Sequence, residues 1–158
     1  MLGGAGQHDV ISAALGQVEL ALPQMRQLPR QLVHGDVAPD NVLMHGSEVI
    51  AIIDFTPFFQ PVLFAVATAV YWYHVHGQRR LDPVGIRASL TAAGHRPWTT
   101  GERQAWPAML AREALRRLAT PLTLAAQTGT GPPARTGARY QAVLSVMDSW
   151  PELQASPQ

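Results

Sequence analysis

Residues 55–73 carry no formal charge over nineteen positions, close to the length that crosses a bilayer. Pro57, Gln60 and Pro61 interrupt this stretch, and the apolar run that remains, residues 62–73, is too short for a membrane span. A helix over residues 62–76 would be apolar on every side, which is typical of a helix buried within a fold. We therefore expect residues 62–76 to form a core helix, and no membrane partner.

The amino-acid composition limits the classes of protein to which this chain can belong. The chain has 158 residues, of which 47% are hydrophobic, so we expect residues 1–158 to form a single domain. A net charge of +1 gives no overall attraction to nucleic acid or to an anionic membrane. Without cysteine or lysine, the chain has no thiolate chemistry and no lysine to grip a nucleotide phosphate. No secretory signal is readable at the start, so we expect a cytoplasmic protein.

Hydrophobic spacing predicts mainly helices, with short strands between them. A helix is predicted over residues 9–28, with Asp9 as its N-cap. Short strands are predicted over residues 31–34, 41–44 and 49–53, with a turn at residues 45–48. Further helices are predicted from Asp82 or Pro83 to about residue 93, over 102–119 and over 139–150, after which the tail frays. The fold class is therefore α+β, mainly α.

The predicted helix over residues 102–119 has two faces. Its apolar positions are expected to face the core, and they are Trp106, Met109, Leu110, Ala114 and Leu118. Its charged positions are expected to face water, and they are Arg103, Arg112, Glu113, Arg116 and Arg117. Nothing in the sequence assigns a bound phosphate to this charged face.

Three carboxylates fall in or beside the most apolar part of this chain, at Asp36, Asp40 and Asp54. Because an unpaired charge is costly to bury, such carboxylates often hold a metal ion or transfer protons. A strand brings Asp36 to a loop, Asn41 enters the hairpin, and its second strand returns with Asp54. Asn41 and Asp54 suit Mg²⁺, and Asp36 could accept a hydroxyl proton. Alternatively these residues only cap turns, which is our interpretation of Asp40.

The string His34-Gly35-Asp36, then Asn41, and later Ile53-Asp54-Phe55 resembles the catalytic core of the aminoglycoside phosphotransferase and choline kinase family. The resemblance is specific over residues 28–55 and looser beyond them. It implies the large, C-terminal lobe of a protein-kinase-like fold, with short β-hairpins at the catalytic loop and a helical remainder over residues 62–150. It also implies that Asp36 is the catalytic base, that Asn41 and Asp54 bind Mg²⁺ beside ATP, and that His34 and Gly35 shape the loop.

The sequence departs from this family pattern in two ways. Gln60 and Phe64 stand where the resemblance leads us to expect carboxylates that support the loop. The residues before Asp9 leave no room for a nucleotide-binding lobe, so we expect the N-terminal lobe to be absent and the isolated chain to be a poor kinase. An uncovered apolar face would then favour a dimer, or a partner that covers this face.

The leading hypothesis is an ATP- and Mg²⁺-dependent kinase that phosphorylates a hydroxyl of a small molecule. The alternative is a truncated or degenerate relative, acting as a non-catalytic binding or regulatory module, or a gene fragment. A metal-dependent phosphoesterase would need more Asp and His ligands than the sequence gathers. His74 and His76 make a poor metal pair and are expected at a solvated helix end. The aromatic run Tyr71-Trp72-Tyr73 is expected to be part core, part interface.

Overall fold

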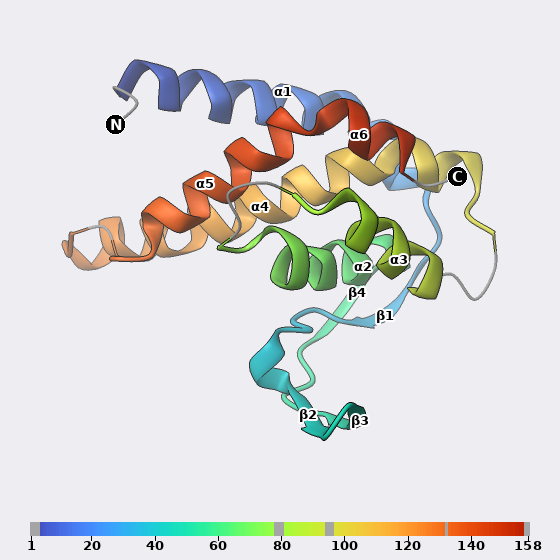
Figure 1. Cartoon of the computed structure of the whole chain (residues 1–158). Coiled ribbons are helices and arrows are strands. Elements are labelled where there is room, and N and C mark those ends of the chain that lie inside the picture. Colours follow the sequence, from blue (N-terminus) through green and yellow to red (C-terminus); the bar gives the residue numbers. More distant parts are fainter. Residues whose placement is uncertain (1–3, 78–80, 94–96, 132, 157–158) are drawn as a thin grey trace.

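The computed structural model describes residues 4–77, 81–93, 97–131 and 133–156, and within them the protein is mainly helical (Figure 1). The α-helices are α1 (Gly4–Gln27), α2 (Val62–Val70), α3 (Pro83–Ala93), α4 (Thr100–Thr128), α5 (Thr136–Asp148) and α6 (Trp150–Ala155). The strands are β1 (Arg30–His34), β2 (Val42–His45), β3 (Glu48–Ile52) and β4 (Pro57–Pro61). This confirms the expected α+β class, in which helices outweigh strands severalfold.

Helix α4 lies at the centre of the helical part and packs against α1, α2, α5 and α6 (Figure 1). All five of its predicted core side chains are buried. A capping box between Thr99 and Glu102 begins the helix, and Gly129, with φ of 68°, ends it. The helix continues beyond the predicted end at residue 119 and includes Pro121. A proline costs a helix one hydrogen bond but does not have to stop it.

The helix after β4 is buried, as its apolar composition predicted. Ala67 has no exposed surface, and Leu63 and Phe64 are also buried. Helix α2 widens at its end into a π-helical turn, Tyr71–Val75, which completes the predicted helix. Within the described ranges, no helix has the length and apolarity to cross a membrane.

The two ends of the chain differ from the prediction. Helix α1 already includes Gly4, so Asp9 lies inside the helix and is not its N-cap, and Pro23 is accommodated within it. The predicted fraying after residue 150 is also wrong, because α6 forms there. Leu153 of α6 is buried, and the Trp106 indole of α4 donates a hydrogen bond to Ser156 Oγ at 3.2 Å.

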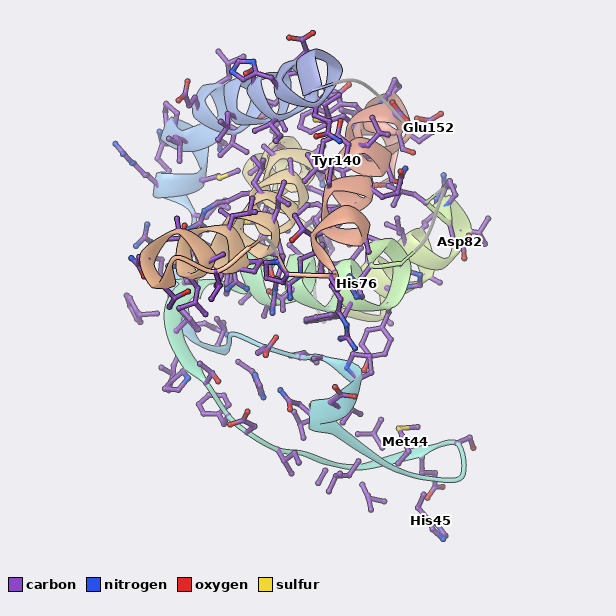
Figure 2. All side chains as sticks on the ribbon, turned by 90° about the vertical axis from the view of Figure 1, so that its left-hand side faces the viewer. Met44, His45, His76, Asp82, Tyr140 and Glu152 are labelled. Atoms are coloured by element: carbon purple, nitrogen blue, oxygen red, sulfur yellow. The ribbon has the colours of Figure 1, made fainter. Side chains whose placement is uncertain are left out.

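The four strands form two separate antiparallel pairs. Strands β2 and β3 form the predicted hairpin, whose tip, marked by Met44 and His45, projects away from the helices (Figure 2). Strand β1 pairs with β4, which the sequence did not predict. Pro57 and Pro61 made residues 57–61 look unlike a strand in the sequence. Each of these prolines lies at an end of β4, where an edge strand tolerates it.

Apolar side chains are exposed on these strands and the loops beside them. The most exposed are Phe59 at 66%, Ile50 at 63% and Leu32 at 61%. Exposed apolar side chains therefore lie on the strands that flank residues 35–41, in the region where the sequence led us to expect an apolar face.

Candidate active site

Hydrogen bonds tie the loop after β1 to the segment after β3. The backbone N–H of Asp36 donates to His34 Nδ1 at 3.1 Å, so the ring proton of His34 resides on Nε2. Nε2 then donates to the carbonyl of Ile53 at 3.2 Å. The backbone N–H of Gly35 donates to the carbonyl of Thr56 at 2.8 Å. Residues 34–36 therefore lie beside residues 53–56, and His34 and Gly35 help to hold them together.

Gly35 is required by a close approach to β4. A Cβ built at this position would lie 1.9 Å from Cδ2 of Phe58 and 2.2 Å from Cε2 of the same ring. The Phe58 ring in turn packs against the buried Phe64, with ring centroids 5.7 Å apart. A side chain at position 35 would push this ring away from the core, which explains a glycine there.

Asn41 links the loop to the hairpin. Its side-chain Nδ2 donates to the backbone oxygen of Asp36 at 2.9 Å, and its backbone oxygen accepts from the N–H of Ile53 at 2.9 Å. Because the amide nitrogen is used in this contact, the Oδ1 atom is the part of the side chain that remains for a cation. The contact with Ile53 brings Asn41 next to the residue that precedes Asp54.

Asp54 has an unusual backbone conformation. Its φ is 52°, which makes it the one residue other than glycine with positive φ in the described part of the chain. Aspartate tolerates this left-handed region better than most residues, and such conformations occur often at functional sites. The Asp54 side chain is exposed at the end of the hairpin, where solvent and a ligand can reach it.

Asp36 is held from the helical side of the molecule. Arg117 Nη2 of α4 lies 2.6 Å from Asp36 Oδ1, and the indole nitrogen of Trp72 donates to the same oxygen at 3.2 Å. Burial alone would raise the pKa of the Asp36 carboxyl, but the hydrogen bond and charge of Arg117, with Trp72 and the charge of Arg116, lower it below its ordinary value. Asp36 is therefore a carboxylate at neutral pH, able to accept a proton.

The expected solvation of the charged face of α4 is wrong for Glu113 and Arg117. Glu113 is 1% exposed, and it accepts hydrogen bonds from both Arg116 and Arg117 at 2.7 Å. The side chain of Arg117 is 14% exposed, and its guanidinium lies 4.7 Å from the centroid of Trp72. Helices surround α4 on several sides, so part of its charged face is covered, whereas Arg103 is exposed as expected.

His74, in the π-helical turn, and His76, directly after it, also depart from the expected solvated helix end. His74 Nε2 is 2.8 Å from Ser89 Oγ of α3, and His76 packs against Trp72 with ring centroids 4.9 Å apart. The two histidines bond to different elements, in agreement with a poor metal pair. Tyr71 is buried, and burial raises its pKa to about 12. Trp72 is half-buried and Tyr73 exposed, so the run is partly core, as expected, and the interface stays a prediction.

The donor set around the loop fits a hard divalent cation. An amide oxygen and a carboxylate are ligands that Mg²⁺ prefers, and this ion keeps several positions for water and phosphate oxygens. Within the described ranges, no three His, Asp or Glu residues gather in a group that could hold a metal ion. Asn41 Oδ1 and the Asp54 carboxylate stay the predicted ligands of a cation at this loop.

Comparison with known proteins identifies the family. Residues 5–105 match the model of the phosphotransferase enzyme family, and the chain belongs to this family. Homoserine kinase of Methylobacillus flagellatus is 42% identical over 93 residues, which are 58% of this chain and 29% of that enzyme. Homoserine kinase of Rhodopseudomonas palustris is 34% identical over 119 residues, which are 74% of this chain and 36% of that enzyme. Homoserine kinase of Pseudomonas aeruginosa is 32% identical over 103 residues, 64% of this chain and 33% of that enzyme.

The chain spans about a third of the length of these curated relatives. No solved structure matches it. The family is one of phosphotransferases, and these relatives are named homoserine kinases. They do not point to aminoglycosides as the acceptor.

Proposed function

We propose that this chain carries the catalytic loop of a cytoplasmic kinase that transfers a phosphoryl group from ATP to a hydroxyl of a small molecule. In this proposal residues 1–158 form one unit, the large C-terminal lobe of a protein-kinase-like fold. The observation that carries it is the connection of Asp36 to Asn41, and of Asn41 to the residue before Asp54, by hydrogen bonds of 2.9 Å. Family membership supports the same chemistry.

Each residue has a distinct role in the proposed reaction. Asp36 accepts the proton of the acceptor hydroxyl as its oxygen bonds to the γ-phosphorus and the bond to ADP breaks. Asn41 Oδ1 and the Asp54 carboxylate are the ligands of Mg²⁺, which supplies charge neutralisation at the phosphates when it is bound. His34 and Gly35 hold the loop against residues 53–56. The acceptor we propose first is homoserine, because the relatives are named for it.

Mass-spectrometric detection of phosphorylated product tests this proposal, with ATP, Mg²⁺ and a panel of alcohols that includes homoserine. Asp36→Asn should lower turnover by about 100-fold or more, the range typical of a lost general base. Asp40→Asn is the matched control, since Asp40 is an exposed carboxylate in the short 3-10 turn Pro39–Asn41. Equal product from the wild-type chain and Asp36→Asn would overturn the assignment.

We also propose that the chain forms a dimer that covers its exposed apolar strands. Phe59 and Ile50 are more than half exposed, and large apolar faces are uncommon on monomers. Light scattering over a range of concentrations should show a dimer, and Ile50→Glu should shift it toward monomer. A wild-type chain that stays monomeric at every concentration would contradict this.

A further inference from the structure

Asp36 depends on a contact from outside its own loop. Arg117 reaches it from α4, 81 positions later, and Trp72 reaches it from the π-helical turn. Both of these contacts end on Oδ1 of the carboxylate. The other oxygen, Oδ2, accepts no hydrogen bond from the residues that the structure describes, so it is the oxygen that stays available to an incoming hydroxyl.

Arg117 is itself fixed from several directions. Its Nε donates to Glu113 Oε1 at 2.7 Å while its Nη2 donates to Asp36, so one planar guanidinium bridges two carboxylates. The Trp72 ring lies against the guanidinium, and Arg139 donates to the backbone oxygen of Arg117 at 3.0 Å. Two carboxylates and a stacked ring restrict the orientation of this planar group, and its bond to Asp36 restricts the carboxylate in turn.

The contacts of the neighbouring Arg116 can be compared directly with those of Arg117. It donates to the same buried Glu113 at 2.7 Å, through Nε and Nη2. Its guanidinium, however, lies over Phe64, at 5.8 Å from the ring centroid, and its side chain is 36% exposed. Arg116 and Arg117 thus share charge and anchor, but the contact with Asp36 belongs to Arg117.

We propose that Arg117 is a positioning residue for the catalytic base: anchored by Glu113, it holds Oδ1 of Asp36 so that Oδ2 is turned toward the acceptor hydroxyl. This inference rests on the proposed function for its catalytic meaning. Its structural part, the control of the Asp36 orientation by Arg117, stands on the contacts alone.

Hydrogen exchange of the Trp72 indole N–H, followed by NMR, tests the structural part without any turnover. This N–H is bonded to Asp36 Oδ1, so its exchange reports where the carboxylate lies. Asp36→Ala gives the exchange rate of the released indole. Arg117→Gln should approach that rate, about tenfold faster than the wild-type chain, the effect of losing one hydrogen bond. Arg116→Gln should stay near the wild-type rate.

Arg117→Gln is expected to fold, because Glu113 keeps Arg116 as a partner and Asp36 is partly exposed. Thermal unfolding of each variant verifies this. Wild-type exchange of the Trp72 indole in Arg117→Gln would overturn the proposal, since Asp36 would then keep its orientation without Arg117. An equal acceleration in Arg116→Gln would also overturn it, because the effect would come from general loosening around Glu113.

Steady-state kinetics tests the catalytic part. Arg117→Gln should lower kcat about tenfold or more and leave KM for ATP and acceptor within about twofold, as expected when only the base is misplaced. Arg117→Lys should recover part of this loss, since an ammonium keeps the charge but does not bridge both carboxylates. An unchanged kcat in Arg117→Gln would overturn the catalytic part. Wild-type turnover that does not depend on Asp36 would instead overturn the proposed function, and the indole exchange would still decide the role of Arg117.

Discussion

The side-chain amide of Asn41 donates to the backbone oxygen of Asp36 at 2.9 Å, across five positions of sequence. This contact closes the loop between β1 and β2 on itself. It joins the proposed base to a proposed metal ligand, and it orients the amide so that its nitrogen faces the loop. The position of Asn41 therefore couples the two proposed functions of the site.

Replacement of Asn41 should affect both functions. Asn41→Leu removes the donor to Asp36 and the ligand oxygen, so we expect Mn²⁺, used as a probe for Mg²⁺, to bind at least about tenfold more weakly. The free energy of unfolding should fall by about 1 kcal/mol, the value of one partly buried hydrogen bond. Isothermal titration and urea unfolding measure the two effects. Asp40→Leu, at the preceding exposed position, should leave Mn²⁺ affinity unchanged, and equal affinities in Asn41→Leu and wild type would refute the role of Asn41.

Glu113 should be among the most sensitive positions for stability. It is buried and compensates two guanidinium groups. Burial alone would lower the pKa of Arg117, but the charge and hydrogen bond of Glu113, and then those of Asp36, raise it above its ordinary value. Glu113→Gln removes that compensation and should cost about 3 kcal/mol in urea unfolding. Glu48→Gln, at an exposed position of β3, is the matched control and should cost less than about 0.5 kcal/mol. Similar losses for the two variants would contradict a buried charge network.

Because α2 is buried, we expect that position 67 does not tolerate a charged side chain. Ala67 has no exposed surface, so Ala67→Asp would place an unpaired carboxylate in the core. We expect this variant to fail to fold as a soluble protein. Ala126→Asp makes the same change at an exposed position of α4 and should remain soluble with a wild-type circular dichroism spectrum. A soluble, folded Ala67→Asp would argue that α2 does not occupy the core.

His76 should make stability depend on pH. Burial, and then the positive charges of Arg139, Arg135 and Arg117, lower the pKa of His76 below its ordinary value of 6.5. The unfolded chain then binds a proton at higher pH than the folded chain, so the stabilisation is complete above about pH 6.5 and is lost as the pH falls through the folded pKa. Tyr71, whose hydroxyl is 3.5 Å from His76 Nδ1, does not titrate in this range.

Urea unfolding between pH 5 and 8 checks this prediction. The wild-type chain should lose more stability than His76→Gln as the solution is acidified through this window, because glutamine takes up no proton. A stability difference between the two proteins that stays constant from pH 8 to pH 5 would show that His76 does not titrate as described.

Local patterns in the sequence predicted most of the loop and its hairpin. The strand before Asp36, the turn at residues 45–48 and the strand before Asp54 follow from alternation and turn residues, which act within a few positions. The buried α2 followed from an apolar composition on every side. These features needed no information about the rest of the fold.

Features that depend on distant parts of the chain were missed. The β1–β4 pair joins segments that flank residues 35–56, and the two prolines of β4 do not fit a typical strand pattern. The spacing of Glu113, Arg116 and Arg117 is that of helical ion pairs and could have predicted their contacts. It could not predict burial, because that follows from α1, α2, α5 and α6 packing around α4. Nor could it predict that Arg117 would reach Asp36.

Paramagnetic broadening by Mn²⁺, observed in the ¹H–¹⁵N spectrum of the full chain, tests the site of Asp36, Asn41 and Asp54 most directly. We predict that low Mn²⁺ concentrations first broaden the side-chain amide of Asn41 and the backbone signals of Asp36 and Asp54. Asp54→Asn should weaken this effect at least about tenfold, and Asp40→Asn should leave it unchanged. Broadening that begins elsewhere in the chain, or that Asp54→Asn does not alter, would contradict a metal site formed by these residues.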